Sequence, residues 1–377
     1  MLIKAFTKIE DIEFLQSSWD ELRRKGGEAT ISYSYYHKML LLNEKSDSPY
    51  LVVIFENEKV LAILPCILAN RKKRFIIGRR KLFEINYKVI QLIEAIVGEI
   101  SKENAENLVS FFSNSTVCDA INLYEQPIST PLYLAVINSK GQIFKAPYVK
   151  QISPHWLITL PEDMGAYMSK FKSKKRKYLK WMLKNFRKEY QLRLEVITDA
   201  QQIDFFLRDG ESISKETYQW ELGSRLVNSE ESKQLFELLA KQKELRAYVL
   251  YANDIPVAFV KSKIINGVFH YESTGYLPEY SQWSAGTILL MLVIEDLIEK
   301  KSANYLNFGM GGDFKGYKST FGTKYHETAV IEMYVKTSIK AMFIYLFDTV
   351  LWYVKKQIRF FMHIRRNGLG ALLKNGK

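Results

Sequence analysis

The chain of 377 residues is longer than one hydrophobic core usually supports, so we expect two packed domains. Its composition, 47% hydrophobic and 25% charged, is that of an ordinary globular protein and excludes extended disorder. The net charge of +13 favours an anionic partner. A phosphate-rich cofactor, nucleic acid and an anionic membrane surface all fit this charge equally well.

Cysteine content and the terminal sequences narrow the classes further. Cys66 and Cys118 lie in apolar or strand-like sequence, so we expect small buried hydrophobes and neither a disulfide framework nor a zinc cluster. Residues 1–11 lack a basic stretch followed by an apolar core, which favours a cytoplasmic protein over a secreted one. Residues 341–354 are apolar but carry Asp348, and they fall short of the roughly 20 residues that span a bilayer.

A β-hairpin pattern occurs once in each half of the chain. Residues 50–55 and 60–68 are strand-like runs around a polar turn, and residues 246–252 and 257–265 repeat the plan. The repetition predicts two related α/β units, each with a mixed sheet and its own core.

Prolines around residues 152–161 bound a further strand and place a domain boundary near Pro161. The predicted segments are an N-terminal domain over residues 1–161, a second domain over 162–336 and a helical tail over 337–377.

Residues 168–186 show helical periodicity with one intensely basic face. Ten Lys and Arg residues from Lys170 to Lys188 stand against the single acid Glu189. This face is either a solvated surface or a surface for an anionic ligand.

The second half then alternates helices and strands. The predicted strands are 192–197, 268–275, 304–308 and 329–335, and the predicted helices are 203–214, 230–243, 287–300 and a short one at 314–320.

The segment 276–290 leads from a strand through a loop into the start of a buried helix. Free backbone N–H groups and the helix dipole attract phosphate at such a position, so a diphosphate would fit there. Gly286 allows close approach of a ligand, and Ser284 or Thr287 either caps the helix or bonds a phosphate oxygen.

Strand alternation predicts that His270, Glu272 and Thr274 share one face. A carboxylate or imidazole beside an amine acceptor can take its proton, so Glu272 is the preferred base and His270 the weaker candidate; each also has a purely structural reading. The sequence contains no metal-ligand motif and no Gly-x-Ser-x-Gly elbow, so we expect no metal and direct attack by the acceptor.

Residues 276–290 and 308–322, with the basic helix and residues 215–219, resemble the CelD/BcsL-like branch of the GNAT acyltransferases, distant relatives of the FemAB peptidyltransferases. The resemblance spans about residues 165–335 and implies tandem GNAT-like domains, the first degenerate. It implies an acyl-CoA co-substrate; aminoacyl-tRNA, the donor of FemAB relatives, is the alternative. The expected contacts to the cofactor come from Thr274, Gln282, Ser284, Ala285, Gly286 and Thr287.

The resemblance also implies roles near the short helix. Tyr317 matches a tyrosine that protonates the departing thiolate in GNAT enzymes. Lys318 is a candidate for stabilising negative charge on the carbonyl oxygen. Asp313 either binds the acceptor ammonium or caps the short helix.

The resemblance implies an N-acyltransferase that acts on an amine of a cell-envelope polysaccharide or lipid-linked sugar precursor. A FemAB-like transferase and a non-catalytic basic scaffold that binds nucleic acid or membrane are the alternatives. From Thr349 to Lys377 the chain has no acid, so the aromatic and basic tail suits an anionic membrane surface or docks on a protein core. The predicted location is therefore cytoplasmic, at the inner face of the membrane if the tail binds lipid.

Overall fold

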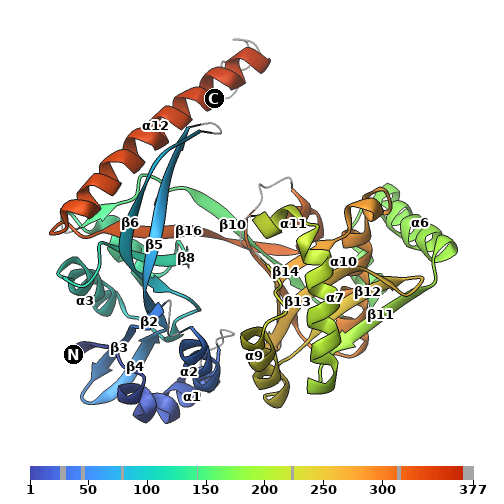
Figure 1. Cartoon of the computed structure of the whole chain (residues 1–377), viewed down its shortest axis with the longest axis horizontal. Helices are drawn as coiled ribbons and strands as arrows, with labels where there is room; N and C mark the ends of the chain where they lie inside the picture. Colours follow the sequence, from blue (N-terminus) through green and yellow to red (C-terminus); the bar gives the residue numbers. More distant parts are fainter. Residues whose placement is uncertain are drawn as a thin grey trace. The chain divides into compact units, whose positions relative to one another are not determined.

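The computed structural model describes residues 1–25, 31–43, 47–77, 80–141, 143–221, 225–311 and 316–367. Contacts divide the chain into two compact units (Figure 1). The first comprises residues 1–26, 43–152 and 327–377, and the second comprises residues 27–42 and 153–326. These units differ from the predicted segments, since residues 27–42 join the second unit and the chain returns to the first unit after residue 326.

The first unit combines two sheets with short helices. Its elements are β1 (Leu2–Phe6), η1 (Glu10–Leu15), α1 (Gln16–Lys25), β2 (Asp47–Pro49), β3 (Leu51–Glu56), β4 (Lys59–Leu64), β5 (Cys66–Ile77), β6 (Arg80–Leu92), β7 (Val97–Gly98), α3 (Lys102–Ser113), β8 (Ala120–Pro127), α4 (Pro131–Asn138), β9 (Phe144–Lys145), most of β16 (Lys324–Tyr334) and α12 (Ile339–Asn367). One sheet has the order β1-β3-β4-β7, and the other contains the run β16-β8-β6-β5-β2 with β9 beside β16.

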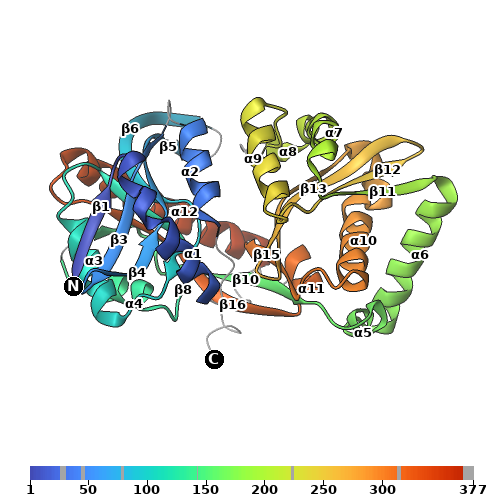
Figure 2. The same cartoon turned by 90° about the horizontal axis from the view of Figure 1, so that it is seen from below.

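The second unit is built on one mixed sheet. Its elements are α2 (Tyr33–Leu42), β10 (Ile152–Thr159), α5 (Met164–Ser169), α6 (Ser173–Glu189), β11 (Leu192–Ile197), η2 (Ala200–Gln202), α7 (Ile203–Lys215), α8 (Tyr218–Glu221), α9 (Glu230–Lys241), β12 (Ala247–Ala252), β13 (Ile255–Ile265), β14 (Val268–Tyr276), η3 (Pro278–Trp283), α10 (Ala285–Glu299), β15 (Tyr305–Met310) and α11 (Tyr317–Phe321). The strand order is β11-β12-β13-β14-β15-β10, with α7 and α9 on one face and α10 on the other (Figure 2).

Both predicted hairpins are present, β3–β4 in the first unit and β12–β13 in the second. The turn residues explain why they form. Asn57 and Glu58 have φ of 47° and 66°, and Asn253 and Asp254 have φ of 50° and 62°. Two successive residues with positive φ give the turn whose twist matches paired antiparallel strands, and Asn and Asp tolerate that conformation better than most residues.

Hydrophobic burial is organised separately in the two units. The first unit has a core between its sheets and α3 and α4, and it includes Cys66 and Cys118. Both cysteines are free and buried, as predicted. The second unit has one core between the sheet and α10 and α6, and another under α7 and α9. These cores confirm the predicted α/β class with a mixed sheet.

The two units repeat one plan at the level of strand register. Strand β6 runs parallel to β8 through three pairs that begin with Val89↔Ala120, and β14 runs parallel to β15 through three pairs that begin with Val268↔Tyr305. In each unit a helix, α3 or α10, connects these parallel strands. The antiparallel partner of β6 is β5, through twelve register pairs, and that of β14 is β13, through eight, so the first unit differs by the greater length of its β5–β6 ribbon.

The long helix predicted over residues 168–186 is two helices, α5 and α6. The break after Ser169 is held by Lys170, whose ammonium donates hydrogen bonds to the carbonyls of Phe321 and Gly322 at the end of α11. Among the residues that the structure describes, no helix is long and apolar enough to cross a membrane.

Candidate active site

The turn from β14 into α10 presents unbonded backbone N–H groups. Ser284 precedes the helix with φ 55° and ψ 46°, and its side chain makes no capping hydrogen bond. Its carbonyl accepts from the N–H groups of Thr287 at 2.8 Å and Ile288 at 3.1 Å. No described residue accepts from the N–H groups of Ala285 and Gly286. A right-handed turn followed by a left-handed residue aims successive N–H groups into one concavity, which favours an anion.

The predicted capping role of Ser284 is therefore wrong. A capping side chain requires an extended backbone at the cap residue, whereas Ser284 is left-handed. The hydroxyl is consequently not used by the helix, and no acidic residue lies in the first turn of α10.

The corresponding helix of the first unit is closed to anions. The side chain of Ser101 accepts a hydrogen bond from the N–H of Asn104 at 3.1 Å, and Glu103 places a negative charge in the first turn of α3. Capping satisfies an N–H group, and the carboxylate opposes a second negative charge. Phosphate binding requires free N–H groups without a nearby negative charge, and of these two helix starts only that of α10 offers them.

Gly286 is explained by packing against a neighbouring ring. A Cβ at this position would lie 3.0 Å from the Tyr276 ring. Gly286 was expected to allow close approach of a ligand; in the structure the group that approaches it is the Tyr276 ring. Gln282, on η3, is exposed.

Strands β14 and β15 separate beside this turn. Their parallel pairing ends at His270↔Asn307, although β14 continues to Tyr276. Glu272 is exposed as a whole residue while its side chain is only 28% exposed, so the main chain of β14 is open there. An open strand edge offers N–H and C=O groups to an extended ligand.

A β-bulge changes which side chains share a face. Along β14 the pairing with β13 passes from Ser262↔Tyr271 to Lys261↔Ser273, which leaves Glu272 without a partner in the ladder. The Thr274 hydroxyl donates to the Phe259 carbonyl and accepts from Tyr271, whose ring packs on the α10 core. The expectation that Thr274 shares a face with His270 and Glu272 is therefore wrong, because an extra residue in a strand shifts the alternation.

Glu272 is the centre of a charged cluster. Its carboxylate lies 2.9 Å from the Lys263 ammonium and 3.5 Å from that of Lys261. Burial alone would raise the pKa of Glu272, but the two lysines outweigh it and lower the pKa to about 2. A carboxylate so stabilised in its charged form is a weak proton acceptor. Its predicted role as base stays a prediction.

His270 lies beside the same cluster with a buried ring nitrogen. Its Nε2 has no hydrogen-bond partner among the described residues. Burial, with the charge of Lys263, lowers the pKa of His270 to about 4, so the imidazole is neutral near pH 7.

Two further imidazoles lie on β10 and β16, beyond β15 in the strand order. His155 Nε2 lies 2.6 Å from the Asn307 amide oxygen, and the His155 ring stacks on His326 at 4.5 Å. Sequence analysis missed these residues and the lysines of β13. The signal available was period-two spacing, as in Lys261 and Lys263, but their meeting across strands required the strand order.

Tyr317 lies beside the start of α10. Its ring packs against Phe308 and Phe321, with centroids 6.3 and 5.0 Å away. Although the residue is 44% exposed, burial of its hydroxyl raises the pKa above its usual value, and a hydrogen bond with Thr287 acts in the opposite direction. Two predicted residues, Tyr317 and Thr287, are thereby brought together.

The Lys318 ammonium is hydrogen-bonded to the end of β15. It donates to the carbonyls of Phe308 at 2.6 Å and Met310 at 2.7 Å. These bonds favour a structural role over the predicted stabilisation of a substrate oxygen. Asp313 lies outside the described residues.

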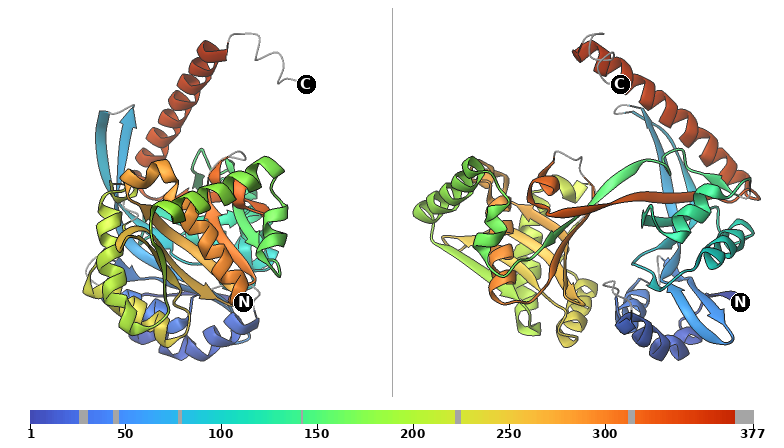
Figure 3. Two further views of the ribbon diagram at one scale, coloured as in Figure 1. Left: turned by 90° about the vertical axis from the view of Figure 1, so that its right-hand side faces the viewer. Right: turned by 180° about the vertical axis from the view of Figure 1, so that it is seen from behind.

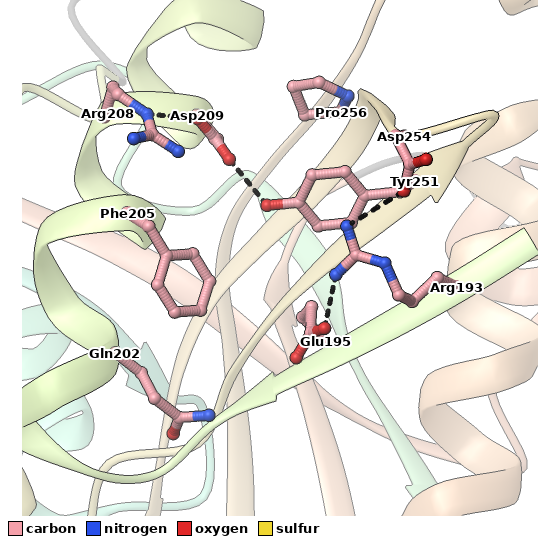
Figure 4. Close-up of a pocket in the computed structure, with 9 residues that line it drawn as sticks. All are labelled: Arg193, Glu195, Gln202, Phe205, Arg208, Asp209, Tyr251, Asp254 and Pro256. Carbon is pink, nitrogen blue, oxygen red and sulfur yellow. Dashed lines mark hydrogen bonds and ion pairs between the residues drawn. The ribbon is translucent and has the colours of Figure 1, made fainter.

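A surface hollow of about 450 Å³ lies elsewhere in the second unit, between β11, α7 and the β12–β13 hairpin (Figure 4). It contains none of the predicted site residues. Its charged groups already pair with each other: Arg193 with Glu195, and Arg208 with Asp209, which also accepts from the Tyr251 hydroxyl at 2.5 Å. These internal pairs leave few groups for a ligand. Among the described residues, no three His, Cys, Asp or Glu side chains are placed to hold a metal ion.

The fold is α/β in both units, and the second unit contains the uncapped helix start. Residues 173–319 match the family model described as acetyltransferase (GNAT) domain, so a GNAT acetyltransferase domain is present in that part of the chain. No curated protein matches the chain.

Solved structures support the fold over most of the chain. FemX matches with a TM-score of 0.54 at 9% identity, covering 89% of this chain and 98% of that one. The C-terminal domain assigned to a lysylphosphatidylglycerol synthetase from Agrobacterium fabrum matches with a TM-score of 0.51 at 13% identity, covering 89% and 95%. A conserved protein of unknown function from Bacteroides thetaiotaomicron matches with a TM-score of 0.50 at 11% identity, covering 89% and 100%.

Proposed function

We propose that the second unit transfers an acyl group from acyl-CoA to an amine. The observation that carries this proposal is the uncapped start of α10, where the N–H groups of Ala285 and Gly286 have no acceptor among the described residues. The diphosphate of CoA is the ligand group that such a helix start suits. The match of residues 173–319 to the GNAT domain supports the same assignment.

The residues around the turn suggest how the thioester is placed. The N–H groups of Ala285 and Gly286 donate to the diphosphate, and the Ser284 hydroxyl is free to add a further hydrogen bond. The open edge of β14 beyond His270 bonds the amide groups of the pantetheine arm. CoA supplies the acyl group as a thioester next to this edge.

The transfer needs two proton movements. The acceptor ammonium first loses a proton; its nitrogen then bonds the acyl carbon as the carbon–sulfur bond breaks, and the sulfur takes a proton. We assign the second proton to Tyr317, whose raised pKa keeps its hydroxyl protonated near pH 7. We assign acceptance of the first to His270, because with a pKa of about 4 it is a stronger base than Glu272 with a pKa of about 2, and its buried Nε2 has no hydrogen-bond partner among the described residues.

The proposed acceptor is an amine of a cell-envelope polysaccharide or of a lipid-linked sugar precursor, on the strength of the CelD/BcsL-like sequence pattern. The polar row formed by His155, His270 and Asn307 suits a hydroxyl-rich acceptor, since imidazole and amide groups both donate and accept hydrogen bonds.

A thermal-shift screen of the full chain with acetyl-CoA and longer acyl-CoA species tests the donor. A ligand that binds only the folded chain raises its melting temperature, by an amount that grows with ligand concentration above Kd. Release of free CoA thiol with a panel of amino sugars then tests the acceptor. Absence of any saturable shift with CoA species would contradict the proposal.

One observation favours a second function, transfer from aminoacyl-tRNA. Helix α6 carries eight Lys and Arg residues against one acid, and Tyr178 and Trp181 stack on its exposed side at 6.0 Å. Exposed aromatic rings among cations bind unpaired bases. Saturable, salt-sensitive binding of charged tRNA without any CoA affinity would select this function instead.

A further inference from the structure

The last helix exposes an apolar stripe that its own unit does not cover. In α12 the side chains of Ala341, Ile344 and Leu351 are buried against the first unit. On its outer side the exposed apolar residues include Ile339, Met342, Leu346, Val350, Tyr353 and Phe361, with exposures between 46% and 72%. Steps of three or four residues from Ile339 to Tyr353, and of about two helical turns from there to Phe361, place them in one line along the helix. From Tyr353 to Ile358 every residue is exposed.

The β5–β6 ribbon lies along this helix (Figure 3). The Phe347 ring packs on those of Phe75 and Phe83, with centroids 5.7 and 4.9 Å away. The helix and the outer half of the ribbon are therefore joined by side-chain packing within one unit. Leu82, on β6, is 52% exposed and adds to the apolar surface.

Both elements carry positive charge on their exposed sides. On the ribbon Lys72, Arg74, Arg80 and Lys81 are exposed. Lys73 and Phe75 contact α12, so strand alternation places Lys72 and Arg74, with Lys81 opposite Ile76, on the other face of the ribbon, where all three cations lie within 3.6 Å of Glu84. On α12 the exposed cations include Lys340, Lys355 and Lys356.

The single acid of α12 points the other way. Asp348 lies 2.9 Å from the Lys73 ammonium, accepts from the Tyr334 hydroxyl at 2.6 Å and is 16% exposed. Its charge is neutralised inside the unit. The outer face of α12, in the part that the structure describes, thus combines apolar side chains with cations and no anion.

We propose that the outer face of α12 docks on an anionic lipid bilayer. The apolar stripe enters the boundary between headgroups and acyl chains, and the exposed lysines of α12 meet the lipid phosphates. Charge complementarity selects this occupant, since a second copy of the chain would present the same positive charge, and nucleic acid would not use the aliphatic stripe. This surface does not depend on the proposed acyl transfer.

Flotation of the full chain with vesicles tests the proposal. The protein is expected to float with phosphatidylcholine vesicles that contain phosphatidylglycerol and to remain below with pure phosphatidylcholine. The charge variant K355E/K356E should weaken binding by at least on the order of thirtyfold, because each of the two lost cations contributes on the order of 1 kcal/mol near an anionic surface and the added carboxylates are repelled. The apolar variant L346E/V350E should abolish binding without loss of fold, since both side chains are exposed. Circular dichroism and the melting temperature check the fold.

The matched control is K180E/K184E, which changes the net charge equally on the other basic helix, α6. It should leave flotation within about twofold. The proposal is overturned if wild type does not float with anionic vesicles, or if the control weakens binding as much as K355E/K356E. It is also overturned if L346E/V350E instead dissociates a dimer in light scattering, or if the surface binds nucleic acid in a manner that L346E/V350E leaves intact.

Discussion

Tyr317 owes its proposed role to its neighbours. Its hydroxyl is desolvated beside Thr287, which belongs to the first turn of α10, so the proton donor and the phosphate site are linked through one contact. Replacing Tyr317 by Phe removes the proton donor and keeps the ring packing. We expect kcat to fall by about 10²- to 10⁴-fold while the Kd for acyl-CoA changes less than about threefold.

Thiol release and calorimetry measure these two quantities. Tyr178→Phe is the control, because Tyr178 is 45% exposed, against 44% for Tyr317, and lies on α6. Equal turnover in wild type and Tyr317→Phe would remove Tyr317 from the mechanism.

His270 makes the stability of the second unit sensitive to acid. Its pKa is about 4 in the folded chain and about 6.5 when unfolded, so the unfolded chain takes up the proton first. The stabilisation is complete above about pH 6.5 and is lost as the pH falls towards 4, with a slope of at most about 1.4 kcal/mol per pH unit. Urea unfolding at pH 7 and 4.5 should show a smaller loss in His270→Gln than in wild type; equal losses would exclude this linkage.

Glu272 adds a second acid-sensitive step at lower pH. Its folded pKa of about 2 lies below the ordinary value of 4.5, so its contribution is complete above about pH 4.5 and is lost between 4.5 and 2. Glu272→Gln removes the carboxylate beside Lys263, which is 3% exposed, and should lower the free energy of unfolding by about 3 kcal/mol.

The double variant Glu272→Gln, Lys263→Met should recover much of this loss, because no buried charge is left unpaired. Urea unfolding of wild type, the two single variants and the double variant measures the free energies of this double-mutant cycle. A strong loss of turnover at unchanged stability would instead support Glu272 as the base predicted from the sequence.

At the scale of elements, Lys318 joins α11 to the end of β15. Its ammonium bonds the carbonyls of Phe308 and Met310, so Lys318→Met should leave two carbonyls less well satisfied and destabilise this end by about 1–3 kcal/mol. Hydrogen exchange should become faster in β15. Lys188→Met, at an exposed position on α6, serves as control. If Lys318→Met slowed turnover without changing hydrogen exchange in β15, the result would instead support the predicted role of Lys318 in stabilising charge on the substrate carbonyl oxygen.

Sequence periodicity predicted most elements of the second unit because each is determined locally. The β12–β13 turn follows from Asn253 and Asp254, and α10 follows from a run of apolar residues. The bulge at Glu272 could not be predicted, since it depends on the register between β13 and β14. The break between α5 and α6 was missed because it is held by Lys170 bonding to α11, about 150 residues away along the chain.

The residues of the candidate site that depend on local sequence were predicted, and those that depend on strand pairing were not. Gly286 and Thr287 were found from the strand, loop and helix pattern, and Tyr317 was found from a sequence resemblance. The partners of Glu272, which are lysines on the neighbouring strand, required the strand pairing. The residue types of β14 therefore indicated a polar site, but the pKa values of His270 and Glu272 depend on the neighbouring strand.

At the scale of the whole molecule, two units with one plan have different helix starts. In the first unit Ser101 caps α3 and Glu103 follows, whereas in the second Ser284 leaves the start of α10 uncapped. We therefore expect one diphosphate site per chain, in the second unit.

Isothermal titration of the full chain with CoA tests this claim most directly, using Ser284→Asp and the isosteric Ser284→Asn. Both residues tolerate the left-handed conformation, and only Asp adds a charge that repels phosphate while favouring the helix start. The account predicts one site in wild type, binding within about threefold in Ser284→Asn and at least about tenfold weaker binding in Ser284→Asp without loss of thermal stability. Equal affinity in the two variants, or two equivalent sites per chain, would contradict it.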